Sequence, residues 1–167
     1  DTRAVHAGRE DLAALGVHAL PLDLSTTYPV ADLDGAADQL DAQGRSLLIE
    51  ATLEKRADLV KILLEHGGDP KLADHEGETA LHFAAQAQQA EIVQLLIDKG
   101  APVDAKDHAG NTPLFKALTT YRGEADGNAI WALLLAGADR TIKNARGVSP
   151  EDLGQGSSNY DLGQFFR

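Results

Sequence analysis

The histidines of this chain, six in number, are its residues best suited to bind a metal ion or to transfer protons near neutral pH. Two of them, His75 and His108, stand 33 residues apart in the related phrases DHEGETALHFA and DHAGNTPLFKA, each directly after an aspartate. One histidine per phrase does not supply the three or four converging ligands that a zinc site needs. His82 lies inside its phrase, TALH, where a hydrogen bond to backbone is the simpler role. We therefore expect no metal site.

The sequence motifs of other catalytic centres do not occur in the chain. It contains no Walker phosphate loop, no G-x-G-x-x-G, no nucleophile elbow and no H-E-x-x-H. Carboxylates at helical spacing, such as Glu50 and Glu54, are typical of a solvated helix surface. The chain has no cysteine, so thiolate catalysis and disulfides are excluded. The sequence predicts no catalytic residue, no bound cofactor and no enzyme.

The net charge of −11, from 26 acidic and 15 basic residues, indicates which partners are electrostatically favoured. A nucleic acid or an anionic membrane would be repelled, so we expect neither, and we expect a charged protein partner to be basic. No run of eighteen apolar residues or signal-peptide pattern is present. Together with the lack of cysteine, these features lead us to expect a cytoplasmic protein.

The elements that position these residues follow from an internal repeat. Four glycines, Gly44, Gly77, Gly110 and Gly147, open similar phrases at spacings of 33, 33 and 37 residues. Self-similarity at such a period is typical of stacked supersecondary units. After Gly77, small and apolar residues at helical spacing in ALHFAA predict a short helix, and EIVQLLI predicts a second, more apolar helix that ends at Gly100.

The repeated phrase resembles the ankyrin repeat, roughly G-x-T-P-L-H-x-A followed by V-x-x-L-L-x-x-G-A-D. The matching residues are Gly77, Thr79, Leu81, His82 and Ala84 in one unit and Gly110, Thr112, Pro113, Leu114 and Ala117 in the next. The resemblance covers about residues 40–153 and implies an all-α solenoid of helix-turn-helix units. The expected units are 41–73, 74–106, 107–143 with an insertion, and a degenerate C-terminal cap repeat at 144–167, after an N-terminal arm or cap at 1–40.

Departures from the ankyrin pattern are also informative. The first unit has Ser46, Leu47 and Ile49 where threonine, proline and histidine are typical, and Phe115 takes the histidine position of the third. The third unit carries four extra residues within TTYRGEADGN, which we expect in a surface loop. Two alternatives stay open for this loop: it is a tolerated insertion, or it contacts a partner through Tyr121 and Arg122.

Residues 1–37 do not share the period. The stretches TRAVHAG (Thr2–Gly8) and PLDLSTTY (Pro21–Tyr28) resemble the N-terminal arm of pyridoxal-phosphate enzymes of cysteine and methionine metabolism, the cystathionine synthase and lyase group. The large domain that holds the catalytic lysine and cofactor in that family is lacking, so the resemblance transfers no catalytic residue. The segment is either a cap, with a short helix expected over residues 33–40, or a joined piece of such an enzyme.

The ankyrin resemblance implies a noncatalytic module that binds another protein through its concave face. The two alternatives are an accessory or fused fragment of a pyridoxal-phosphate enzyme of sulfur amino acids, and self-association in which the N-terminal arm is the ligand. The candidate partner-binding positions at the tips and on the first helices are Gln43, Arg45, His75, Glu76, His108, Asn111, Glu50, Leu53, Phe83, Gln86, Lys116 and Thr120, joined by Tyr121 and Arg122 of the insertion. Phe83 either anchors a partner or packs between units.

Overall fold

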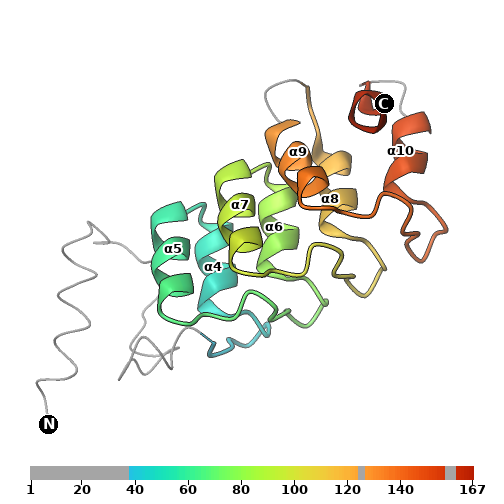
Figure 1. Cartoon of the computed structure of the whole chain (residues 1–167). Coiled ribbons are helices and arrows are strands. Elements are labelled where there is room, and N and C mark those ends of the chain that lie inside the picture. Colours follow the sequence, from blue (N-terminus) through green and yellow to red (C-terminus); the bar gives the residue numbers. More distant parts are fainter. Residues whose placement is uncertain (1–37, 124–126, 157–160) are drawn as a thin grey trace, which may run out of the picture.

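The computed structural model describes residues 38–123, 127–156 and 161–167, and it confirms the all-α repeat fold (Figure 1). The helix pairs stand side by side in chain order, which gives a row of first helices beside a row of second helices. The first helices are α4 (Leu47–Leu53), α6 (Ala80–Gln86), α8 (Pro113–Thr120) and α10 (Pro150–Gly156), and the second are α5 (Ala57–Glu65), α7 (Ala90–Asp98), α9 (Gly127–Leu135) and the 3-10 helix η2 (Leu162–Phe166). Among the described residues, β-structure is limited to two isolated bridges.

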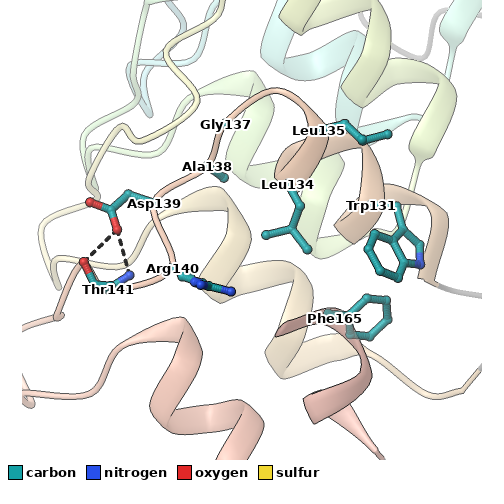
Figure 2. Close-up of a pocket in the computed structure, with 9 residues that line it drawn as sticks. All are labelled: Trp131, Leu134, Leu135, Gly137, Ala138, Asp139, Arg140, Thr141 and Phe165. Atoms are coloured by element: carbon teal, nitrogen blue, oxygen red, sulfur yellow. Dashed lines mark hydrogen bonds between the residues drawn. The ribbon is translucent and has the colours of Figure 1, made fainter. Parts of the chain in front are cut away.

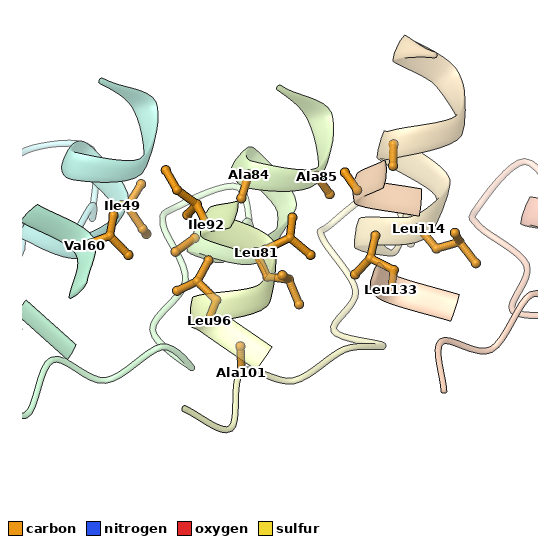
Figure 3. Close-up of a cluster of buried hydrophobic side chains, with 14 of the residues drawn as sticks. Ile49, Val60, Leu81, Ala84, Ala85, Ile92, Leu96, Ala101, Leu114 and Leu133 are labelled. Atoms are coloured by element: carbon orange, nitrogen blue, oxygen red, sulfur yellow. The ribbon is translucent and has the colours of Figure 1, made fainter. Parts of the chain in front are cut away.

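The helix pairs are held together by one continuous apolar core. Helix α6 packs against α4 and α8, and α7 packs against α5 and α9. The first helices present small buried side chains such as Ala84 and Ala117, which allow close approach, while Val60, Leu96 and Leu133 of the second helices are fully buried (Figure 3). Each such aliphatic side chain stabilises the fold by about 1.5–3 kcal/mol. No helix pair has enough apolar partners within itself to bury these groups.

The tips, which are the turns at residues 41–45, 74–78, 107–111 and 144–148, are joined by a ladder of backbone hydrogen bonds. The amides of His75, His108 and Ala145 donate to carbonyl oxygens of the preceding tip at 3.1, 2.9 and 2.9 Å. Within each tip, a leading Asp or Asn accepts backbone amides; Asp74 Oδ1, for example, receives those of Glu76 and Glu78 at 2.9 Å each. The recurrent Asp or Asn three residues before each glycine is therefore structural.

Glycine is required where one tip lies on the next. Gly110 has a φ of +76°, and a Cβ there would stand 3.1 Å from backbone atoms of both Asn144 and Ala145. Gly147 has the same φ of +76° but nothing within 4 Å of a Cβ. The two positions share the backbone conformation and differ only in how closely a neighbour approaches.

His82 is fully buried and connects two neighbouring units. Its Nδ1 accepts the Thr79 amide at 3.1 Å, and its Nε2 lies 3.1 Å from the carbonyl oxygen of Asn111 in the next tip. The neutral ring with hydrogen on Nε2 satisfies both contacts, because Nδ1 must accept. Burial lowers the pKa of His82, against the opposing effect of the Asn111 carbonyl. The expectation that this histidine hydrogen-bonds backbone is therefore confirmed.

The helix expected over residues 33–40 does not extend over residues 38–40, the first that the structure describes. Residues 33–37 and the rest of the N-terminal arm lie outside the described part of the chain. Residues 38–40 are not helical, and Leu40 forms an isolated bridge with Ser46. The carboxylate of Asp38 accepts the amide of Asp69 at 2.7 Å, just as that of Asp104 accepts the amide of Asp139 at 2.9 Å. The repeat architecture thus reaches back to residue 38.

The insertion in the third unit holds the C-terminal cap, which corrects the view of Tyr121 as an exposed anchor. Six residues, 121–126, join α8 to α9, whereas three join α6 to α7. Tyr121 is only 4% exposed and meets Phe165 of η2 edge to face at 5.3 Å. Its hydroxyl also accepts a hydrogen bond from Gln164 at 3.2 Å. Residues 124–126 of the loop lie outside the described residues.

We expect Gly110→Ala to destabilise the fold more than the matched control Gly147→Ala. Both substitutions place alanine at a positive φ, which costs about 1–2 kcal/mol, and only Gly110→Ala adds the clash with the next tip. Urea unfolding followed by circular dichroism gives both free energies of unfolding. Equal losses for the two variants would contradict the close tip-to-tip contact.

We also expect the free energy of unfolding to decrease as the pH is lowered, because of His82. The pKa of His82 is lower in the folded than in the unfolded chain, so the unfolded chain binds more protons. The contribution of the neutral ring to the free energy of unfolding is therefore complete above the unfolded pKa and is lost as the pH falls below it. The melting temperature should therefore drop between about pH 7.5 and 5.5, and His82→Gln should flatten this dependence. His108→Gln, at an exposed tip, is the control and should leave the slope as in the wild type. An unchanged slope in His82→Gln would contradict the assignment.

Candidate binding surface

The first helices and the tips together form one surface, which we call the helix–tip face. A groove of about 470 Å³ lies on it, where the second and third units meet the C-terminal cap. Its lining residues come from α6, α8, α10 and two tips: Gln86, Ala109, Asn111, Phe115, Lys116, Thr119, Asn144, Ala145, Arg146, Val148 and Leu153. Three of the sequence-predicted positions, Gln86, Asn111 and Lys116, are brought together here.

Other predicted positions, at the tips and on α4, lie outside the groove. His75, Glu76 and His108 are exposed at the tips, as is Gln43. Glu50 pairs with Arg45 at 3.2 Å, and Leu53 is 38% exposed. These residues can meet only a partner long enough to span several units.

Besides Tyr121, three more predicted positions, Phe83, Thr120 and Arg122, make contacts within the molecule. Phe83 is partly buried and packs against the core. The Thr120 hydroxyl accepts a hydrogen bond from the Gln88 amide at 3.1 Å. The guanidinium of Arg122 donates to the carbonyl oxygen of Tyr121 at 3.3 Å.

Sequence reasoning missed the groove residues of the last unit: Asn144, Arg146, Val148 and Leu153. This unit had been expected only as a degenerate cap, yet its tip stacks on the third tip and so forms one wall of the groove. The signal that could have found these residues is NARGVSP, which has the same Asp-or-Asn to glycine spacing as the other tips. Phe115 was noted only as a departure from the histidine pattern, and it is this departure that turns an aromatic ring toward the groove.

Lys116 takes part in an ion network between two units. Its ammonium pairs with Glu78 and lies 3.3 Å from Asp107 Oδ2; the three side chains are 21%, 15% and 5% exposed. Partial burial acts to lower the pKa of Lys116, but the hydrogen bonds and charges of Glu78 and Asp107 outweigh it and raise that pKa. Burial likewise acts to raise the pKa of Asp107, while hydrogen bonds from Asn111 and Lys116 lower it overall. The charge of Lys116 is therefore compensated within the molecule.

A second hollow lies beside α9 and η2 (Figure 2). It has a volume of about 630 Å³, and its apolar lining includes Trp131, Leu134, Leu135 and Phe165. Trp131 and Leu135 are 45% and 87% exposed, and the Trp131 ring stacks edge-on against Phe165 at 5.2 Å. Asp139 also lines the hollow, and its carboxylate accepts hydrogen bonds from the backbone amide and the hydroxyl of Thr141, which stabilises a turn.

The described ranges contain neither a cluster of metal ligands nor a membrane-spanning helix. No cluster of three or more His, Cys, Asp or Glu side chains is arranged there to hold an ion. None of the helices in residues 38–123, 127–156 and 161–167 has the length and hydrophobicity to cross a bilayer.

We expect Lys116→Met to destabilise the protein by about 1–2 kcal/mol, because Glu78 and Asp107 would be left as adjacent, largely buried carboxylates. Lys61→Met, at an exposed position of α5, is the control and should change the free energy of unfolding by less than about 0.5 kcal/mol. Urea unfolding at neutral pH measures both. Equal effects for the two variants would show that the network contributes no net stability.

Two comparisons with known proteins relate the chain to others. A family model described as ankyrin repeats (3 copies) matches residues 47–144. A segment of 42 residues is 62% identical to L-methionine gamma-lyase of Streptomyces avermitilis. That segment is 25% of this chain and 10% of the lyase, so the chain spans about a tenth of the length of this curated relative. This match confirms that the chain contains a segment resembling an enzyme of the sulfur amino acid group.

The ankyrin model covers more than half of the chain, and the structure shows its helix pairs, glycine tips and shared core in that same region. Ankyrin repeats are protein–protein interaction modules and are generally non-enzymatic. The chain belongs to the ankyrin-repeat family.

Proposed function

We propose that this chain is a noncatalytic module that binds another protein through its helix–tip face, with the groove as the centre of the contact. The observation that carries the proposal is the groove itself, because three helices and two tips line one open hollow. The residues at this surface differ from unit to unit. Partners of repeat proteins are commonly bound along such an extended surface. An interface of standard size buries roughly 800 Å² per partner.

The chemistry of the groove suits a polypeptide. Phe115, Val148 and Leu153 supply apolar contact area, while the side chains of Gln86, Thr119 and Arg146 supply polar groups around it. Aromatic and arginine side chains are enriched among the residues that dominate protein interfaces.

The test is a matched pair of bulky substitutions on opposite surfaces. Thr119→Trp fills the groove from an exposed position of α8, and Leu135→Trp adds the same ring at an exposed position of α9, near the second hollow. Proteins captured by the wild-type chain should be lost at least about tenfold with Thr119→Trp and retained with Leu135→Trp, as measured by quantitative mass spectrometry. Circular dichroism must show that both variants are folded.

Retention of every captured protein by Thr119→Trp would contradict the proposal. Selective loss with Leu135→Trp would instead place the contact at the hollow beside α9 and η2. Tyr121 has no part in this test, because its burial makes any effect of substitution structural.

We propose as a second candidate that the lyase-like segment relates the repeats to a pyridoxal-phosphate enzyme of sulfur amino acids, as a fused or accessory piece. The 42-residue likeness supports it. If this is correct, a subunit with the absorbance of bound pyridoxal phosphate and with lyase activity should co-purify with the chain. Purified complexes without either property would contradict this candidate and leave the first untouched.

A further inference from the structure

The ionisable residues that line the groove differ in sign from the net charge of the chain. The chain carries a net charge of −11, yet the two ionisable residues that line the groove, Lys116 and Arg146, are both cationic. No aspartate or glutamate is among the described residues that line it. Because exposed charges are screened over about 10 Å at ordinary ionic strength, a bound segment is influenced by the charges nearest to it more than by the net charge, and these include Glu78 and Asp107 beside Lys116.

The two cations are not equally able to meet a ligand. The ammonium of Lys116 is already paired with the carboxylates of Glu78 and Asp107. Arg146 is exposed, and its guanidinium makes no ion pair with any residue in the described part of the chain. A planar guanidinium can donate two parallel hydrogen bonds to one carboxylate, which a solvated arginine offers to an incoming ligand.

The backbone that carries Arg146 is held firmly. Its amide donates to Asn144 Oδ1 at 3.0 Å, and the neighbouring amide of Ala145 donates to the carbonyl of Ala109 in the third tip at 2.9 Å. The base of the side chain is therefore fixed relative to α8, while its end remains in solvent. This arrangement places a cation at a defined edge of the groove.

The other polar groups along this edge are used internally. The side-chain amide of Asn144 donates to Asn111 Oδ1 at 3.0 Å, and the side-chain amide of Asn111 donates to Asp107 Oδ2 at 2.9 Å. These side chains link the third and fourth tips. Arg146 thus remains as the charged group available for recognition, beside the apolar contact area of Phe115, Val148 and Leu153.

We propose that the groove takes a peptide segment of another protein in which a carboxylate side chain stands close to a large apolar side chain. The carboxylate pairs with Arg146, and the apolar side chain covers Phe115, Val148 and Leu153. This inference rests on the proposed binding function of the helix–tip face. It replaces the expectation of a basic partner, which was based on a net charge summed over all surfaces.

The test uses a phage-displayed library of random peptides selected on the full chain. Wild-type protein should enrich peptides with Asp or Glu near Leu, Ile, Phe or Trp. Arg146→Glu should lose this preference and weaken a selected peptide at least about tenfold in Kd. Lys143→Glu makes the same charge change on the same unit but outside the groove, and it should keep both the preference and the Kd. Arg146→Lys should recover part of the affinity.

The possible results separate this inference from the function on which it rests. One result is that the selected peptides fail to bind Thr119→Trp and yet show no preference for acidic residues, and another is that they bind Arg146→Glu as well as the wild type. Either result would overturn the acidic assignment and leave the binding function standing. No enriched peptide, or peptides indifferent to Thr119→Trp, would overturn both. Concentration-dependent self-association that Arg146→Glu abolishes would overturn the assignment in favour of an acidic segment of a second copy.

Discussion

The structure depends on burial that no helix pair can complete alone. The inner first helices, α6 and α8, each meet a first helix on two sides, and small residues such as Ala84 of α6 suit close approach. The second helices add larger aliphatic side chains that fill the space behind them, including Leu96 and Leu133. Because the apolar surface of one pair is covered by the next, stability is shared along the stack, and the ends need covering of their own.

Polar groups then set the register of this apolar stack. His82 joins its own helix start to the next tip, the Lys116 network joins the second and third units, and the tip ladder joins successive turns. These contacts are directional, whereas burial of apolar surface is not, so they favour one alignment of neighbouring units among several that would bury similar area. His82 and the Lys116 network are buried or partly buried, and each has a partner, as the low polarity of their surroundings requires.

The C-terminal end shows how one insertion alters both stability and the available surface. The longer connection after α8 brings Tyr121 into contact with Phe165 and Gln164 of η2. Through these contacts η2 covers the end of the third unit. This packing leaves Trp131 and Leu135 partly open on one side of the cap, while the tip with Arg146 completes the groove on the other. The cap is therefore both the closure of the solenoid and one wall of its candidate binding site.

The sequence alone determined the helix-turn-helix units, their glycine tips and the buried role of His82, because these follow from a period that is visible along the chain. It also placed Gln86, Asn111 and Lys116 among the positions of one face. Only the tertiary structure decided that Tyr121 is buried, that Lys116 is paired with carboxylates and that Arg146 borders the groove. Each of these facts depends on residues more than 25 positions apart in sequence, such as Tyr121 with Phe165 or Lys116 with Glu78, and a local pattern carries no record of such distant contacts.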